Sequence, residues 1–265
     1  MFSTTQHLGV TVLGSGSKGN ATLVHCGKEA ILVDAGFSLR DFRRRLAEAA
    51  LPDDLCLQGI LITHEHTDHI RGLAKIADAF GAPVFTTTRC AAAINATAKA
   101  PIPCNRIEAG STFRIRDFTI RSFSIPHDAA DPVGYTVSRD CGKAGIATDF
   151  GICTISIIDA LKGCGALVIE SNHDLKLLDA SNRPIQLKYR IKGNFGHLSN
   201  GAACDVIERL APQGLRQLIL AHLSEECNTP QLAHDTAAAC LQRLHRTDVG
   251  LAVAQQTEPL HTVWL

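Results

Sequence analysis

Short apolar runs alternate along the chain with longer segments of helical spacing, and glycine, proline or polar residues separate them. Apolar runs of strand length predict strands at 10–13, 21–25, 30–33, 58–63, 84–87, 113–115, 118–124, 134–138, 143–148, 166–170, 215–220 and 250–254. Helical spacing predicts helices at 39–50, 70–80, 91–98, 154–161, 200–210 and 231–244, with Asn200 as an N-cap. This alternation is typical of an α/β protein.

The order of these segments contains a weak internal repeat. In the first half a strand ends at Asp34 and a later one at His64, and in the second half strands end at Asp149 and His222. This parallel placement predicts two similar halves packed sheet to sheet, with helices outside. No linker is long enough to separate them, so we expect one domain over residues 1–265.

Composition narrows the class of protein. The 265 residues include 26 basic and 26 acidic side chains, so any attraction to nucleic acid must be local. Ten cysteines occur without a Cys-x-x-Cys pair, which argues against a zinc ribbon or a redox pair. Neither a leader pattern nor a long apolar window is present, so we expect a cytoplasmic protein with no membrane partner.

Metal-ligand residues gather where the strand at 58–63 should end. His64 follows the apolar run, and His66, Asp68 and His69 come within the next five residues. His64 and His66 are two apart in an extended chain and point to the same side, whereas Asp68 and His69 can turn toward a second position. One short segment can thus serve two metal ions, although a solvated, histidine-rich turn is the plain alternative.

Three further candidates, His127, Asp149 and His222, stand at other strand ends. Imidazoles with a bridging carboxylate suit a pair of borderline metal ions, Zn or Mn, with Fe also compatible. We assign His64, His66 and His127 to one ion, Asp68, His69 and His222 to the other, and Asp149 to the bridge between them. Two divalent ions ~3.5 to 4 Å apart would share a hydroxide.

This ordered set resembles the five motifs of the metallo-β-lactamase fold hydrolases. The motif residues are His64-Glu-His66-Thr-Asp68-His69 with Asp34, His127, Asp149 and His222. The resemblance implies a four-layer αβ/βα sandwich with a dinuclear site at one edge between the sheets. It also implies that Asp34 positions the ligand segment without being a ligand itself.

Local features narrow the substrate within this superfamily. Asp149 stands where common β-lactamases carry cysteine, so hydrolysis of lactams is disfavoured. The surroundings of His127 lack the Gly-His-Thr signature of glyoxalase-II-like thioesterases, which argues against a thioester substrate. Flavodiiron proteins place a carboxylate where His66 stands, which argues against an oxygen-reducing function. The 73 positions from Asp149 to His222 are too few for the large inserted domain of ribonuclease J.

Three stretches favour a phosphate-containing substrate. A glycine-rich loop at 14–20 resembles a phosphate nest, 170–174 follows a strand, and 196–200 precedes a helix start that can receive an anion. The substrate-binding candidates are Ser15, Ser17, Lys18, Asn20, Asn172, His173, Ser199 and Asn200. Arg183, Lys188, Arg190 and Lys192 supply local positive charge, unless they form only a solvated basic face.

Together these stretches resemble the YycJ/WalJ-like branch of the superfamily, which is associated with exonuclease action on DNA from the 5′ end. The implied reaction is attack on phosphorus by a hydroxide held between two metal ions and oriented by Asp68. His197 or a metal-bound water would protonate the leaving oxygen. We expect contacts with the DNA backbone more than with particular bases.

Other functions share this site. A small-molecule phosphodiesterase, acting for example on cyclic phosphates, or a glyoxalase-II-like thioester hydrolase would keep the metal centre and change the substrate. A metal-binding regulatory protein without turnover belongs to a different class.

Overall fold

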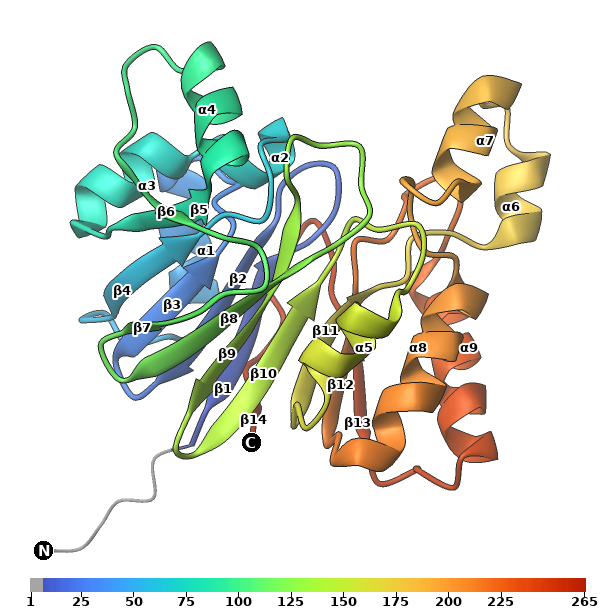
Figure 1. Ribbon diagram of the computed structural model, residues 1–265. Coiled ribbons are helices and arrows are strands. Elements are labelled where there is room, and N and C mark those ends of the chain that lie inside the picture. The colour runs from blue at the N-terminus through green and yellow to red at the C-terminus, as the bar shows by residue number, and fades with distance from the viewer. Residues whose placement is uncertain (1–6) are drawn as a thin grey trace, which may run out of the picture.

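Two seven-stranded sheets pack face to face in the computed structural model, which describes residues 7–265 (Figure 1). The first sheet has the order β14-β1-β2-β3-β4-β5-β6 and the second the order β13-β12-β11-β10-β9-β8-β7. The first contains β1 (Gly9–Gly14), β2 (Ala21–Cys26), β3 (Glu29–Val33), β4 (Cys56–Leu61), β5 (Val84–Thr87), β6 (Cys104–Ile107) and β14 (Val263–Trp264). The second contains β7 (Thr112–Ile115), β8 (Phe118–Ser124), β9 (Val133–Arg139), β10 (Gly142–Ala147), β11 (Ala166–Glu170), β12 (Gln217–Ala221) and β13 (Gly250–Val253).

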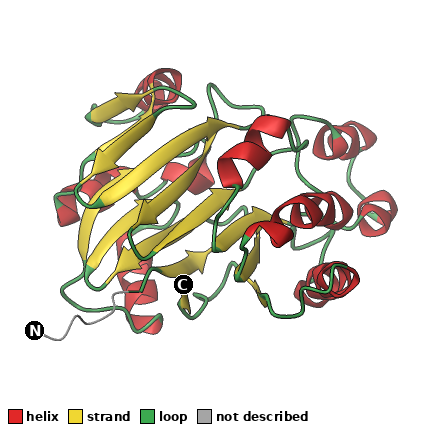
Figure 2. Ribbon diagram, turned by 60° about the horizontal axis from the view of Figure 1, so that its bottom comes forward, coloured by secondary structure: helices red, strands yellow, loops and turns green. Residues whose placement is uncertain are grey.

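Helices cover the outer faces of both sheets (Figure 2). Those that follow strands of the first sheet are α1 (Leu39–Glu48), α2 (Thr67–Ile70), α3 (Leu73–Phe80) and α4 (Thr88–Thr97). Those of the second half are α5 (Ile155–Leu161), α6 (Leu175–Ala180), α7 (Ile185–Lys192), α8 (Asn200–Leu210), the short 3-10 helix η1 (Ala211–Gln213) and α9 (Pro230–Arg243). The predicted αβ/βα sandwich is confirmed. No helix among the described residues is long and apolar enough to cross a membrane.

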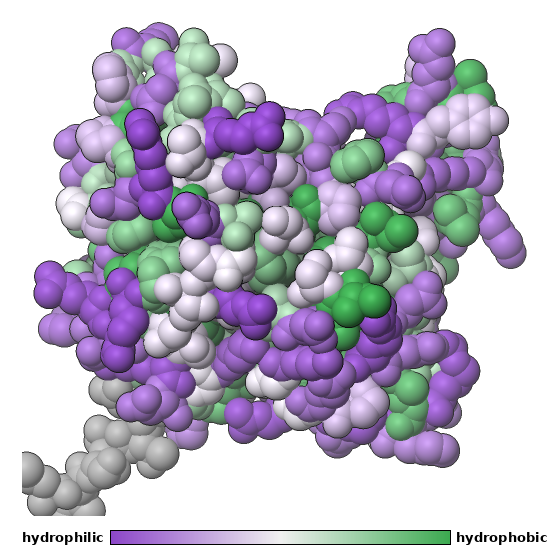
Figure 3. Space-filling view, viewed as in Figure 1, coloured by the Kyte–Doolittle hydropathy of each residue, from purple (hydrophilic) through white to green (hydrophobic). Residues whose placement is uncertain are grey.

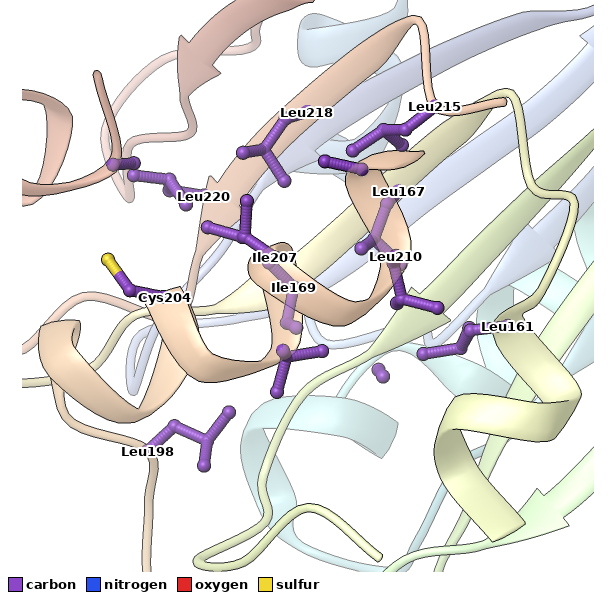
Figure 4. Close-up of a cluster of buried hydrophobic side chains, with 14 of the residues drawn as sticks. Leu161, Leu167, Ile169, Leu198, Cys204, Ile207, Leu210, Leu215, Leu218 and Leu220 are labelled. Carbon is purple, nitrogen blue, oxygen red and sulfur yellow. The ribbon is translucent and has the colours of Figure 1, made fainter. Parts of the chain in front are cut away.

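The strands are apolar on both faces because each face meets a different layer. In β2, Val24 faces the core between the sheets, whereas Leu23 packs among the helices of the first half. The core under α8 shows the same principle in the second half, with Ile207 and Leu210 beside Leu167 of β11 (Figure 4). Full burial of such a side chain stabilises the fold by about 1.5 to 3 kcal/mol.

The structure corrects several predicted elements. The helix expected at 70–80 is two helices, α2 and α3, separated at Gly72, whose backbone packs directly against the carbonyl of Phe37. Ser199 is the N-cap of α8 in place of Asn200, because its hydroxyl accepts a hydrogen bond from the backbone N–H of Ala202. The short edge strands β6 and β14 were not predicted, since each of them depends on pairing with one neighbouring strand.

The segment expected to be only polar and basic, 171–194, contains the helices α6 and α7. They form an arm that projects from the second half (Figure 1). Leu178 and Ile191 anchor the arm by burying their side chains against Cys227, in a cluster separate from the main cores. Because only these two positions of the arm are buried in that way, the apolar periodicity is too sparse to predict helices.

Gly36 has no side chain, and this lets the backbone after β3 pack directly against the backbone of the predicted ligand segment. Its N–H donates to the carbonyl of Asn20, and the N–H of Asn20 donates to the carbonyl of Asp68. A Cβ atom on Gly36 would overlap the Asp68 carbonyl oxygen.

We expect Gly36→Ala to lower the free energy of unfolding by about 3 kcal/mol, the upper end of the cost of overpacking. The matched control is Gly201→Ala in α8, where an added Cβ would meet only the Ser199 hydroxyl at 3.8 Å. That change should be neutral or stabilising by up to about 1 kcal/mol. Urea unfolding of both variants measures the difference, and equal midpoints would show that the Gly36 contact is not tight.

Candidate metal centre

The seven predicted ligands meet at one edge of the two sheets. His64, His66, Asp68 and His69 follow β4, and the other three lie after β8, β10 and β12. Asp149 and His222 adopt left-handed backbone angles, with φ of 62° and 56°. Asp34, at the corresponding place in the first half, also has φ of 62°. Non-glycine residues seldom adopt this conformation, and it tends to occur at functional sites.

One group of ligand atoms comes from His64, His66 and His127. These nitrogens lie within 4.8 Å of one another. His64 Nε2 is 3.0 Å from His66 Nδ1, and the His127 ring lies edge-on to both rings at 5.1 Å. His127 Nδ1 donates to the carbonyl of Phe195 at 3.1 Å, which leaves its Nε2 available to a ligand.

The second group comes from Asp68, His69 and His222, with Asp149 beside it. Asp68 Oδ2 is 3.5 Å from His69 Nε2 and 3.8 Å from His222 Nε2. Asp149 Oδ2 is 3.4 Å from His69 Nε2, and His64, His69 and Asp149 also form a compact group. The arrangement therefore matches the two predicted triads with an aspartate between them, while the ligand roles themselves stay a prediction.

Two orphaned atoms show that this centre fits divalent cations. Asp149 Oδ2 and His222 Nε2 are buried without a hydrogen-bond partner. An unpartnered buried carboxylate oxygen is costly unless a cation or a donor satisfies it. In His69 and His222 the Nδ1–H donates to a carboxylate, so that Nε2 faces the other ligand atoms, as in many metal sites.

The pKa values of the buried histidines shift in opposite directions, according to whether histidines or carboxylates surround them. Burial lowers the pKa of His64, and the neighbouring histidines lower it further. Burial also lowers the pKa of His69, but the carboxylates of Asp34 and Asp149 outweigh this and raise it to about 9. His222 behaves similarly, since Asp149 raises its pKa well above the ordinary value despite burial. The excess of negative charge is a second sign that cations belong here.

Asp34 holds the ligand segment in place, as its predicted role requires. Its Oδ1 accepts the backbone N–H of Thr63 at 2.9 Å, and its Oδ2 accepts His69 Nδ1–H at 2.8 Å. The Thr63 hydroxyl also donates to this carboxylate. Asp34 is only 3% exposed, so solvent does not compete for these bonds.

The glycine-rich loop does not form the expected phosphate nest. The backbone N–H groups of residues 15, 16, 18, 19 and 20 all donate to protein acceptors. Ser15 accepts the N–H of His222, and the Asn20 amide lies 3.1 Å from His69 Nε2. The loop therefore supports the metal centre, while Ser17 and Lys18 remain near the surface, Lys18 in an ion pair with Glu225.

Three of the other substrate-binding candidates are also engaged within the protein, and the fourth, His173, is buried. Asn172 donates to the carbonyl of His222, Asn200 bonds to Ser171 and Asn228, and Ser199 caps α8. His173 is 1% exposed, and neither of its ring nitrogens has a partner. Binding of substrate by these residues stays a prediction, and Asn172 alone among the four lines a cavity described below.

Glu170 is a site residue that the sequence interpretation missed. It ends β11, is fully buried, and accepts Nδ1–H bonds from His197 at 2.8 Å and His222 at 2.9 Å. Its other oxygen accepts the N–H groups of Phe150 and Leu198. Burial alone would raise the pKa of Glu170, but the two histidines lower it overall, so the carboxylate is ionised. An acid that ends an otherwise apolar strand is the signal that could have revealed it.

The fold and this centre together define a metallohydrolase built from two α/β halves. Residues 29–223 match the family described as the Beta-lactamase superfamily domain. The chain therefore belongs to this family, and the predicted resemblance is confirmed.

Two curated relatives are similar over most of the chain. Exodeoxyribonuclease WalJ from Streptococcus pneumoniae is 32% identical over 248 residues, which are 92% of this chain and 90% of that protein. Exodeoxyribonuclease YycJ from Bacillus anthracis is 32% identical over 235 residues, 88% of each chain. Among solved structures, the metallo-beta-lactamase fold protein YhfI from Bacillus subtilis has a TM-score of 0.71 at 16% identity and covers 96% of this chain and 99% of that chain, which shows a shared fold.

We expect Asp34→Asn to lower the affinity for divalent metal by about 10- to 100-fold, because an amide cannot hold His69 and Thr63 in the same way. Competition with a chromophoric chelator measures the affinity, and circular dichroism checks the fold. Asp78→Asn, exposed on α3, is the matched control and should bind metal like the wild type. Unchanged affinity in Asp34→Asn would mean that the ligand segment holds its own shape.

Proposed function

We propose that the chain is a metal-dependent exodeoxyribonuclease that acts from the 5′ end, with residues 1–265 as one hydrolase domain. The observation that carries this proposal is the pairing of the seven-ligand centre with the buried Glu170–His197 contact. The centre can hold cations that bind a phosphate, and His197 can donate a proton beside them. The names of the two curated relatives support DNA as the substrate.

His64, His66 and His127 would hold one divalent ion and Asp68, His69 and His222 the other, with Asp149 between them. When bound, Zn or Mn would activate a water as nucleophile and neutralise the charge that develops on the phosphoryl oxygens. Asp68, 22% exposed in its side chain, is the ligand candidate most open to solvent in its group and can orient that water.

His197 is the residue that can protonate the leaving oxygen. Its Nδ1–H donates to Glu170, which fixes the ring and leaves Nε2 to carry a proton toward substrate. Burial lowers the pKa of His197, but Glu170 and Asp149 outweigh burial and raise the pKa above its ordinary value. These carboxylates favour the protonated form of His197, which is the form that a general acid needs.

The four predicted basic side chains of the arm are all paired with acceptors on the protein. Arg183 bonds to Glu226, Arg190 to Asp128, and both Lys188 and Lys192 to Asp179. Three of these partners are carboxylates, and Lys188 bonds to the backbone carbonyl of Asp179. Exposed ion pairs contribute only about 0 to 1 kcal/mol, so the backbone phosphates of a DNA strand can replace the partners. We propose that the arm contacts the DNA backbone in this manner.

Metal dependence is the first test. Purified protein treated with EDTA should lose hydrolysis of end-labelled DNA, and Mn or Zn should restore it. His66→Ala and Asp68→Ala should each lower the metal-restored rate by more than about 100-fold, because they remove ligands. His234→Ala on α9 is the histidine control and should keep the wild-type rate. Turnover of a small cyclic diester with none of DNA would contradict the nuclease proposal.

The role of His197 has a separate test. His197→Gln should lower kcat on DNA by about 10²- to 10⁴-fold, the usual contribution of a general acid. Bis(p-nitrophenyl) phosphate should lose little, because its leaving group departs without a proton. A comparable loss on both substrates would assign His197 to binding or to the metal centre. Stopped assays of the two substrates with equal metal loading make the comparison.

A further inference from the structure

A cavity of about 430 Å³ opens beside the metal centre, on the side of the proton donor. His197 and His222 line it at the centre, and Arg183 and Arg190 line it from the arm. Its volume is that of a site for one small ligand, not of a channel for a whole strand. The surface of the arm is mixed: hydrophilic side chains alternate with exposed apolar ones, among them Leu175, Ile185 and Tyr189 (Figure 3).

The position of His197 decides which part of a substrate enters this cavity. The group that receives the proton is the leaving oxygen, so the fragment attached to that oxygen lies on the side of His197. Since the cavity adjoins His197, the leaving fragment occupies it. In an exonuclease that acts from the 5′ end, as the proposed function has it, that fragment is the terminal nucleotide.

Resting on the proposed function, we infer that this cavity binds the 5′-terminal nucleotide of the strand, with its 5′-phosphate on Arg183 and Arg190. The water oxygen bonds to the phosphorus between the first and second nucleotides, and the bond from that phosphorus to the first nucleotide's O3′ breaks. O3′ takes the proton of His197, and the attacking water gives up a proton. The product in the cavity is a 5′-mononucleotide with a free 3′-hydroxyl.

The two arginines suit a terminal phosphate better than an internal one. A terminal phosphate monoester carries up to two negative charges, and guanidinium groups bind such oxygens in a bidentate manner. Cleavage at O3′ also leaves a new 5′-phosphate on the remaining strand, so each turn creates the end that the cavity binds next. Cleavage on the other side of phosphorus would leave a hydroxyl end without that charge.

The acidic residues of the cavity do not prevent this binding. Glu226 is paired with Arg183 at 2.6 Å and Glu225 with Lys18 at 2.6 Å. The Glu226 side chain is 66% exposed, so it can turn to solvent when a phosphate replaces it. Arg190 is held by Asp128, whose side chain is 34% exposed.

End preference is the first experiment. Metal-loaded wild type should degrade a 5′-phosphorylated single strand faster than the same strand with a 5′-hydroxyl, should leave a circular strand intact, and should release 5′-mononucleotides. Arg183→Ala combined with Arg190→Ala should lower kcat/KM on the phosphorylated strand by roughly 10- to 100-fold, the range for lost charge-assisted hydrogen bonds. The hydroxyl-ended strand lacks the terminal charge and should lose less, so the preference for the phosphorylated end should fall.

Lys176→Ala is the matched control, because Lys176 is exposed on α6, is not one of the four basic side chains assigned to the DNA backbone and does not line the cavity. It should keep the wild-type end preference. Three results would overturn the assignment of the cavity while leaving the nuclease proposal intact. They are equal wild-type rates on the 5′-phosphorylated and the 5′-hydroxyl strand, cleavage of the circular strand, and release of nucleoside 3′-phosphates.

Binding separates the two proposals further. In calorimetry, thymidine 5′-monophosphate should bind the wild type and Lys176→Ala at least about tenfold tighter than thymidine, and the double arginine variant should lose that difference. If the wild type hydrolyses no DNA, the proposed function fails and this measurement still decides the cavity. Equal binding of the two compounds to the wild type would overturn the cavity proposal.

Discussion

The carboxylate of Asp34 is the constraint on which the metal centre depends. It fixes the chain direction at Thr63 and the ring of His69 at once, and thereby places the whole segment from His64 to His69 at the end of β4. Because Asp34 is buried, the bonds are not weakened by solvent. The left-handed backbone at Asp34 turns its side chain into this position.

Glu170 does the same for the second half. It binds backbone N–H groups of the loops that carry Asp149 and His197, and it orients the rings of His197 and His222. Each sheet thus contributes one buried carboxylate that holds histidine side chains. Burying two such charges is costly unless donors surround them, and each carboxylate here has several. The expected internal repeat therefore extends from the strand order to the way in which each half supports its ligands.

The two halves differ in what they place around the centre. The first half supplies the ligand segment and a glycine-rich loop whose N–H groups are occupied by the protein. The second supplies His197, the arm of α6 and α7, and the cavity between them. The same metal chemistry is open to many members of the family, so the substrate must be selected by these second-half features. A basic arm above a one-nucleotide cavity suits the end of a strand.

The sequence by itself determined the fold class and the set of predicted ligands. Apolar runs of strand length mark the strands, and ligand residues at strand ends meet at one edge whenever parallel strands share a sheet, so spacing alone was informative. The tertiary structure decided what depends on distant contacts. Ser15 meets His222 across 207 positions, Glu170 meets His222 across 52, and α7 borders the cavity because Ile191 packs on Cys227. No local pattern records such pairs, since they join residues far apart in the sequence that only the folded chain brings together.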